Sequence, residues 1–151
     1  MAEAYFNMLA GKYGSAWRAV SAGVCAAEGL PASANAVALM QEFSAHLDDF
    51  RSRSVSVGML QDSALIICME AQHCRAITNF YPRAAEKTKL LANWLKEGNR
   101  ESDISWLSED FDFYRSCFNT MKTALDNLFE YVNQRGNFKT PQICQSTLAS
   151  I

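Results

Sequence analysis

One apolar run constrains the fold of this chain more than any other feature. Residues 65–69 read Leu-Ile-Ile-Cys-Met, and apolar side chains do not alternate with polar ones. A strand with one face in water shows such alternation, whereas a strand buried on both faces does not. Strands of the second kind are typical of a parallel sheet covered by helices on both sides. The run therefore predicts an α/β protein.

A long amphipathic helix is predicted to begin at Phe111. Its apolar residues recur alternately three and four positions apart: Phe111, Tyr114, Phe118, Met121, Leu125, Leu128 and Val132. Polar and charged residues occupy the opposite side, and Gly136 ends the pattern. A coiled coil is the rival interpretation, but a stripe of about three heptads with aromatic residues on the seam favours packing on a sheet.

The rest of the chain alternates between shorter helices and strands. Strands are predicted over 17–21, 65–69 and 88–91, and helices over 1–10, 33–43, 57–61 and 70–80. Ser33 is expected to cap its helix, and Pro82 to stop the helix before it. Residues 137–151 show no clear period and are predicted to be a loosely held tail. We therefore expect one domain over 1–136 and a C-terminal tail over 137–151.

Composition excludes several classes of protein. The 151 residues suit one domain, and the net charge of −2 predicts no binding to nucleic acid or to an anionic membrane. The longest apolar run, 64–69, is far shorter than the roughly 18 residues of a membrane span. The N-terminus lacks the pattern of a signal peptide, so a cytoplasmic location is the default expectation. The five cysteines are an odd number without a CxxC pair, which predicts neither a disulfide framework nor a zinc site, and no cofactor is expected.

Several short strings occur in the order and spacing of one known family. They are residues 1–4 (MAEA), 21–23 (SAG), 31–37 (PASANAV), 51–53 (RSR), 65–69 (LIICM), 89–91 (KLL) and 114–117 (YRSC). Over residues 1–132 the chain resembles the low-molecular-weight protein-tyrosine phosphatases. The resemblance implies a three-layer, doubly wound parallel sheet whose first strand lies in the centre.

In the resembled family the central strand leads into a Cys-x5-Arg loop. The resemblance implies that a cysteine thiolate there attacks phosphorus, while backbone N–H groups and the arginine bind the phosphate. Met1 aligns just after this loop, so the strand and the loop would both lie upstream of the sequence. That placement accounts for a count of three predicted strands against four large helices.

The resemblance implies two catalytic parts, the Cys-x5-Arg loop and an Asp-Pro general acid. None of the five cysteines has arginine six positions on; the residues found there are Pro31, Cys74, Phe80, Thr123 and Ser150. The family's Asp-Pro general acid aligns with Ser105-Trp106, and serine cannot donate a proton usefully near neutrality. Asp103, Glu109 and Asp110 would replace it only if the loop were shifted in register. No catalytic residue is therefore assigned.

The resemblance predicts a phosphatase-like protein that is catalytically inactive as written. Trp106 and Leu107 are candidates for a substrate-binding groove, and the favoured alternative is that they pack the loop onto the last helix. Arg51 and Arg53 are candidates for a weak anion site, although solvated arginines are the commoner case. His46 is expected at the surface. His73 beside Cys74 is interpreted as structural or exposed rather than as a metal ligand.

Two other functions stay open at this point. One is a genuine tyrosine phosphatase, or a domain of one, whose loop lies upstream of Met1; the other is an arsenate reductase-like protein of the same fold. A sheet without its central strand exposes backbone groups on two neighbouring strands. We therefore predict a homodimer, with exchanged elements as one form of it, unless the tail fills the gap. A phosphotyrosine protein or a phosphate-like anion is the expected ligand.

Overall fold

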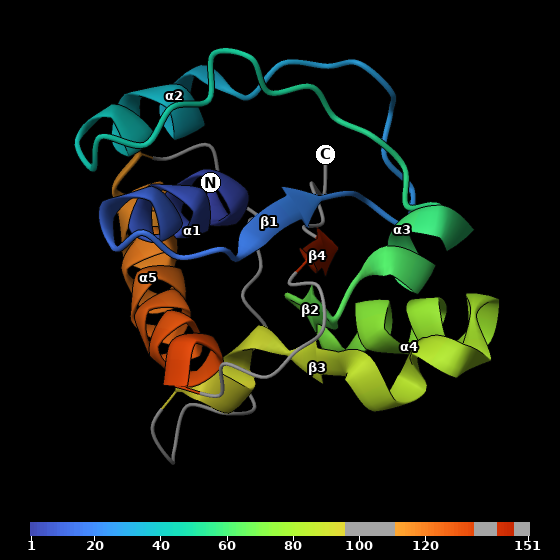
Figure 1. The fold of residues 1–151 in the computed structure, drawn as a ribbon. Coiled ribbons are helices and arrows are strands. Elements are labelled where there is room, and N and C mark those ends of the chain that lie inside the picture. Colours follow the sequence, from blue (N-terminus) through green and yellow to red (C-terminus); the bar gives the residue numbers. More distant parts are fainter. Residues whose placement is uncertain (96–110, 135–141, 147–151) are drawn as a thin grey trace.

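The computed structural model contains a parallel β-sheet between two layers of helices (Figure 1). The structure describes residues 1–95, 111–134 and 142–146. Within these ranges the strands follow the order β1-β4-β2-β3, and all neighbouring pairs are parallel. The strands are β1 (Arg18–Ser21), β2 (Leu65–Cys68), β3 (Thr88–Leu90) and β4 (Gln142–Ser146).

Helices cover both faces of the sheet. They are α1 (Ala2–Lys12), α2 (Ala34–Gln41), α3 (Val57–Asp62), α4 (Ala71–Phe80) and α5 (Phe111–Gln134), with 3-10 turns η1 (Pro82–Lys87) and η2 (Leu91–Trp94). Figure 1 shows α1 and α5 on one side of the sheet and α3 and α4 on the other. None of the described helices is both long enough and apolar enough to cross a membrane.

Strand β2 explains why two helical layers form. Ile67 belongs to the core cluster that α1 and α5 build, whereas Ile66 and Cys68 belong to the cluster of α3 and α4. All three side chains are fully buried. Successive side chains of a strand point to opposite faces, so an unbroken apolar run needs a cover on each. The prediction of a three-layer α/β fold is confirmed.

Local signals placed the ends of several helices correctly. The Ser33 side chain accepts a hydrogen bond from the Ala36 backbone N–H at 3.3 Å, as expected of an N-cap. Helix α4 ends at Phe80, two residues before Pro82. Helix α5 extends to Gln134, and the predicted stripe of apolar residues is buried from Phe118 to Val132 and partly buried at Phe111 and Tyr114.

The prediction of a loosely held tail is wrong for residues 142–146. These residues form β4, which pairs with β1 on one side and with β2 on the other. Ile143 lies opposite Ala19 and Leu65, and Cys144 lies opposite Val20 and Ile66. A short strand flanked on both sides satisfies its backbone groups through its neighbours and needs no sequence period of its own. The chain's own C-terminal segment thus occupies the central position that three predicted strands left empty.

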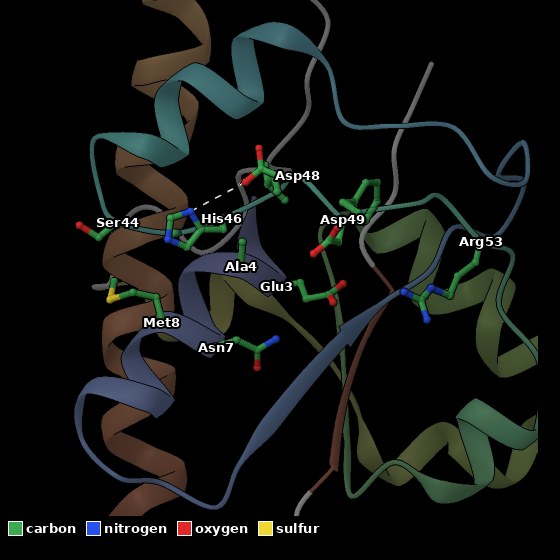
Figure 2. Close-up of a pocket in the computed structure, with 12 residues that line it drawn as sticks. Glu3, Ala4, Asn7, Met8, Ser44, His46, Asp48, Asp49 and Arg53 are labelled. Carbon is green, nitrogen blue, oxygen red and sulfur yellow. Dashed lines mark ion pairs between the residues drawn. The ribbon is translucent and has the colours of Figure 1, made fainter.

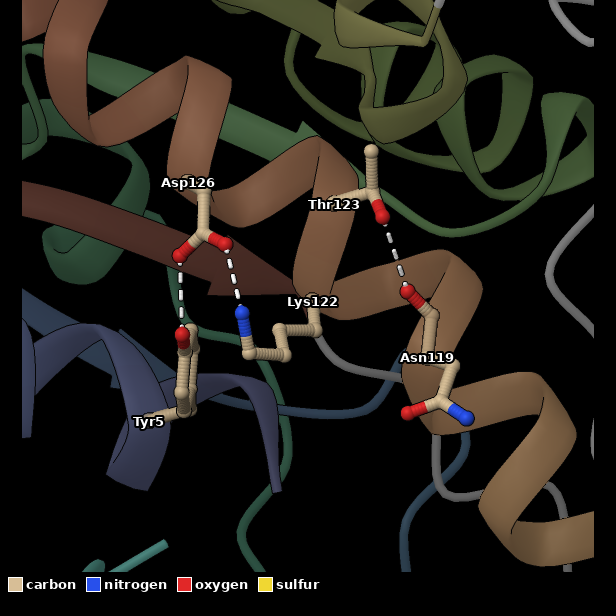
Figure 3. Close-up of polar contacts among 5 residues, drawn as sticks. All are labelled: Tyr5, Asn119, Lys122, Thr123 and Asp126. Atoms are coloured by element: carbon tan, nitrogen blue, oxygen red, sulfur yellow. Dashed lines mark hydrogen bonds and ion pairs between the residues drawn. The ribbon is translucent and has the colours of Figure 1, made fainter.

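Helices α1 and α5 are joined by a polar contact at the side of their apolar interface (Figure 3). The Tyr5 hydroxyl donates to Asp126 Oδ1 at 2.8 Å, and Lys122 Nζ donates to Asp126 Oδ2 at 2.8 Å. Burial, and then the bond to Asp126, raises the pKa of Tyr5 above its usual value. The bond to Asp126 likewise raises the pKa of Lys122. The contact therefore depends on a neutral phenol and a charged ammonium.

We expect Tyr5→Phe to lower the free energy of unfolding at neutral pH. The further loss of stability at alkaline pH should be smaller in this variant than in the unmodified chain. The lost bond to a carboxylate is worth about 1.5–3 kcal/mol. The pKa of Tyr5 is higher in the folded than in the unfolded chain, so its contribution is complete below about pH 10 and falls above it. The raised pKa of Lys122 has the same consequence, because the stability that its charged ammonium contributes is also lost as the pH rises. Urea unfolding at pH 7 and above pH 10 measures both effects, and an unchanged alkaline loss in the variant would contradict the assignment.

Candidate functional site

The candidate site lies at the carboxyl edge of the sheet, next to the first turn of α1. Strands β1, β2 and β4 end there at Ser21, Cys68 and Ser146. Glu3 accepts hydrogen bonds from the Ser21 backbone N–H at 2.8 Å and from the Ser21 hydroxyl. Ligands of open α/β sheets bind outside the carboxyl ends of the strands, so this edge is where a site is expected.

A second pair of hydrogen bonds joins α1 to β1, one helical turn further along α1 than the contact of Glu3 with Ser21. The Asn7 amide donates to the Ala19 carbonyl at 2.9 Å and accepts from the Ala19 backbone N–H at 2.9 Å. Because β1 is an edge strand of the described sheet, the bonds to Asn7 satisfy backbone groups of β1 that do not pair with β4. Glu3 and Asn7 therefore fix the position of α1 relative to the site.

A cavity of about 350 Å³ opens between α1 and the segment that follows α2 (Figure 2). Helix α1 contributes Glu3, Ala4, Asn7 and Met8, and the following segment contributes residues 44–50 and Arg53. Figure 2 shows polar side chains from both segments around it. Its charged lining is mostly acidic, with three carboxylates (Glu3, Asp48 and Asp49) against the guanidinium of Arg53.

This cavity does not provide the cationic cradle that a phosphate needs. Arg51 directs its guanidinium at backbone oxygens, donating to Phe50 at 2.6 Å and to Asp48 at 3.2 Å. Arg53 reaches the cavity, but two aspartates line it as well. His46 is at the surface, as predicted, with Nδ1 at 3.9 Å from Asp48 Oδ2. The described residues therefore do not assemble the weak anion site for which Arg51 and Arg53 were candidates.

Two of the described cysteines, Cys68 and Cys117, do not provide an accessible and activated thiol. Cys68 is fully buried on the α3 and α4 side of the sheet. Burial raises the pKa of the Cys117 thiol, which disfavours the nucleophilic thiolate. Cys25 is exposed in a loop. Neither Cys68 nor Cys117 therefore has the features of a catalytic nucleophile.

His73 is buried in α4 and lies beside an acidic group. Its Nε2 is 4.0 Å from Glu70 Oε2, and Gln72 donates to the same oxygen at 2.5 Å. Across the ranges 1–95, 111–134 and 142–146, no group of three or more potential ligands is arranged to hold a metal ion. The surroundings of His73 are therefore those expected of a structural residue.

Other predicted residues lie outside the part of the chain that the structure describes. These are Ser105, Trp106 and Leu107, together with Asp103, Glu109 and Asp110. Conversely, the sequence pattern did not predict the hydrogen bonds of Glu3 and Asn7 to β1, nor strand β4. Glu3 and Asn7 are four residues apart on one helical face, which was the available signal.

The sequence matches one known protein family over most of its length. The sequence model of the family described as low molecular weight phosphotyrosine protein phosphatase matches residues 1–137. A search of curated protein sequences gave no match to this chain. Strand β4 begins beyond the matched residues, so the family pattern does not account for it.

Solved structures of phosphatases share the fold. The low molecular weight protein tyrosine phosphatase from T. tengcongensis is 29% identical, with a TM-score of 0.78, and the match covers 86% of this chain and 88% of that one. YwlE arginine phosphatase from Geobacillus stearothermophilus is 24% identical, with a TM-score of 0.78 and coverages of 89% and 84%. Vibrio vulnificus Wzb in complex with benzylphosphonate is 21% identical, with a TM-score of 0.75 and coverages of 86% and 87%.

The family match spans most of the sequence, and the four-stranded parallel sheet between helical layers agrees with these structures. This chain belongs to the low molecular weight phosphotyrosine protein phosphatase family.

Proposed function

We propose that this chain keeps the phosphatase fold without phosphatase chemistry and has a structural or binding role. The observation that carries the proposal is the occupant of the sheet centre. That position belongs to β4, and the five residues after it, Thr-Leu-Ala-Ser-Ile, contain no arginine. Cys144 lies in β4, but Ser150 stands six positions on. A neutral hydroxyl cannot replace the planar cation that pairs with phosphoryl oxygens.

The electrostatics of the carboxyl edge support the same proposal. The described cavity next to α1 has more carboxylates than cations, which disfavours a phosphate dianion. Cys68, which also lies at a strand end, is sealed in the core. The named relatives include a tyrosine phosphatase, an arginine phosphatase and a protein in complex with benzylphosphonate. Hydrolysis of a phosphate ester requires groups that stabilise the transferring phosphoryl group. In this chain the general-acid position is proposed to be Ser105, which adds a second missing part.

The binding role is proposed to use the segment around Trp106 and Leu107. Aromatic and aliphatic side chains there would provide a groove for an aromatic side chain of a partner protein. A protein that binds without hydrolysing would give substrates a longer residence than an active relative does. We propose a cytoplasmic location for this activity.

The test is hydrolysis of p-nitrophenyl phosphate by the purified chain. We expect a rate indistinguishable from buffer, against a typical enzyme turnover of about 10 s⁻¹. The T. tengcongensis phosphatase, assayed under the same conditions, is the positive control. Cys144→Ser and Cys68→Ser variants are assayed in parallel.

Hydrolysis that either cysteine substitution abolishes would overturn the proposal and would favour a genuine phosphatase. A version extended upstream of Met1 would address the alternative that a preceding strand and loop supply the chemistry. Activity in the extended version alone would assign the chemistry to the added residues and would leave the proposal intact for these 151.

A further inference from the structure

We propose that the cavity between α1 and the segment after α2 binds a free basic amino acid, a molecule with two cationic groups and one carboxylate. The cavity of about 350 Å³ is lined by three carboxylates and one guanidinium, together with apolar side chains. Pockets for small ligands span about 300–1,000 Å³, so the cavity has room for a ligand of this size. The site is separate from the segment around Trp106 and Leu107 and does not depend on its role.

Charges of opposite sign face this cavity without pairing with one another. Within the part of the chain that the structure describes, no ion pair joins Arg53 to any of the three carboxylates. Figure 2 shows the Arg53 guanidinium directed toward Glu3 and Asp49, with Asp48 and His46 further along the cavity. A ligand that carries both kinds of charge would bridge groups that the chain itself keeps apart.

Glu3 has one carboxylate oxygen bonded to β1 and one that remains for a ligand. Both hydrogen bonds from Ser21 go to Oε2, and the described residues donate none to Oε1. The amide of Asn7 is not available in the same way, because its donor and its acceptor are both bonded to Ala19. The α1 side of the cavity therefore offers a carboxylate oxygen to a cationic group.

The opposite wall of the cavity is held by backbone contacts. The Arg53 carbonyl accepts a hydrogen bond from the Gly23 N–H at 2.9 Å. The Leu47 carbonyl accepts one from the Phe50 N–H at 3.1 Å, and the Leu47 side chain is buried. The chain on either side of Asp48 and Asp49 is thus positioned before a ligand arrives. Such preorganisation lowers the ordering that binding would otherwise cost.

The balance of charges selects the class of ligand. Three carboxylates against one guanidinium leave an excess of negative charge, which opposes a phosphate dianion but attracts a molecule with a net positive charge. Arginine pairs well with a carboxylate, so Arg53 is the expected partner of the ligand's own carboxylate. Ala4 and Met8 add apolar surface for a methylene chain. Lysine, which combines these three features, is the probe that the cavity fits.

The test is isothermal titration calorimetry of the purified chain with L-lysine and two analogues. We expect lysine to bind with a dissociation constant in the millimolar range or tighter. Norleucine lacks the side-chain ammonium, and 1,5-diaminopentane lacks the carboxylate. Each analogue leaves one charged group of the cavity without a partner, so each should bind at least about tenfold more weakly than lysine. Chemical shifts of the Ala4 and Met8 methyl groups locate the bound lysine.

Substitutions separate the two kinds of contact. Arg53→Gln should weaken lysine binding by at least about tenfold and should not weaken binding of 1,5-diaminopentane, which has no carboxylate. Asp49→Asn should weaken binding of both molecules. The matched control is Arg75→Gln, which removes the same charge from an exposed position of α4 that does not line the cavity. We expect this control to bind lysine as the unmodified chain does.

Absence of heat and of methyl shifts with lysine up to about 50 mM would overturn the proposal. Equal affinities for lysine and the two analogues, or equal losses in Arg53→Gln and Arg75→Gln, would also overturn it. Circular dichroism checks that each variant is folded. If a variant does not fold, the three ligands with the unmodified chain decide: a preference for lysine over both analogues, with shifts at Ala4 and Met8, supports the site.

Discussion

Removing residues 137–151 is expected to abolish cooperative unfolding of this protein. The deletion takes away β4, which pairs with β1 and β2 in the middle of the sheet. A net contribution of about 0.5–1.5 kcal/mol for each backbone hydrogen bond, summed over two ladders, is comparable with a total stability of about 5–15 kcal/mol. Thermal unfolding followed by circular dichroism should lose its sharp transition.

The matched control for this deletion removes only residues 147–151. That variant keeps the whole of β4, from Gln142 to Ser146, and we expect it to retain a sharp transition. If the shorter and the longer deletions unfold at the same temperature as the full chain, β4 contributes no stability. Loss of the transition in the longer deletion alone would locate the effect in the strand.

The second large effect is expected from Phe118→Ala. Phe118 is fully buried in α5, and its ring lies 5.5 Å from the ring of Tyr5 and 4.9 Å from that of Phe43, measured between centroids. It therefore joins α5 to α1 and to the segment after α2. Truncating a buried phenylalanine costs about 3–5 kcal/mol, because apolar contacts are lost and a cavity remains. Urea unfolding measures the change.

Phe113→Ala on the same helix is the matched control. Phe113 is 39% exposed, so its truncation removes less buried surface and leaves less of a cavity. We expect a clearly smaller loss of unfolding free energy than for Phe118. Equal losses for the two variants would contradict the assignment of Phe118 to the joint between the helices.

The elements that were predicted correctly can be recognised from the pattern of side chains within their own segment. Residues 65–69 and the stripe from Phe111 to Val132 show their environment in the order of their side chains, because burial on one side or on both imposes a period. The sequence therefore predicted β2, α5 and the layered architecture. Ser33 belongs to the same group, since an N-cap acts within three residues.

The missed elements depend on contacts between distant parts of the chain. Strand β4 is short and contains two glutamines, and it is a strand because β1 and β2 flank it more than 70 residues away in sequence. The bond from Ser21 to Glu3 likewise exists only once α1 has packed on β1. Local propensity does not report such pairing. The roles assigned to Trp106, Leu107 and Ser105 stay predictions.

Amide hydrogen exchange of β4 tests the central claim most directly. A strand with partners on both sides engages its backbone N–H groups, and core strands exchange only through large-scale opening. We predict that the amides of residues 143–146 are protected as strongly as those of Ile66 to Cys68 in β2. Exchange of residues 143–146 at the rate of an unstructured peptide, with β2 still protected, would show that the C-terminal strand does not occupy the centre of the sheet.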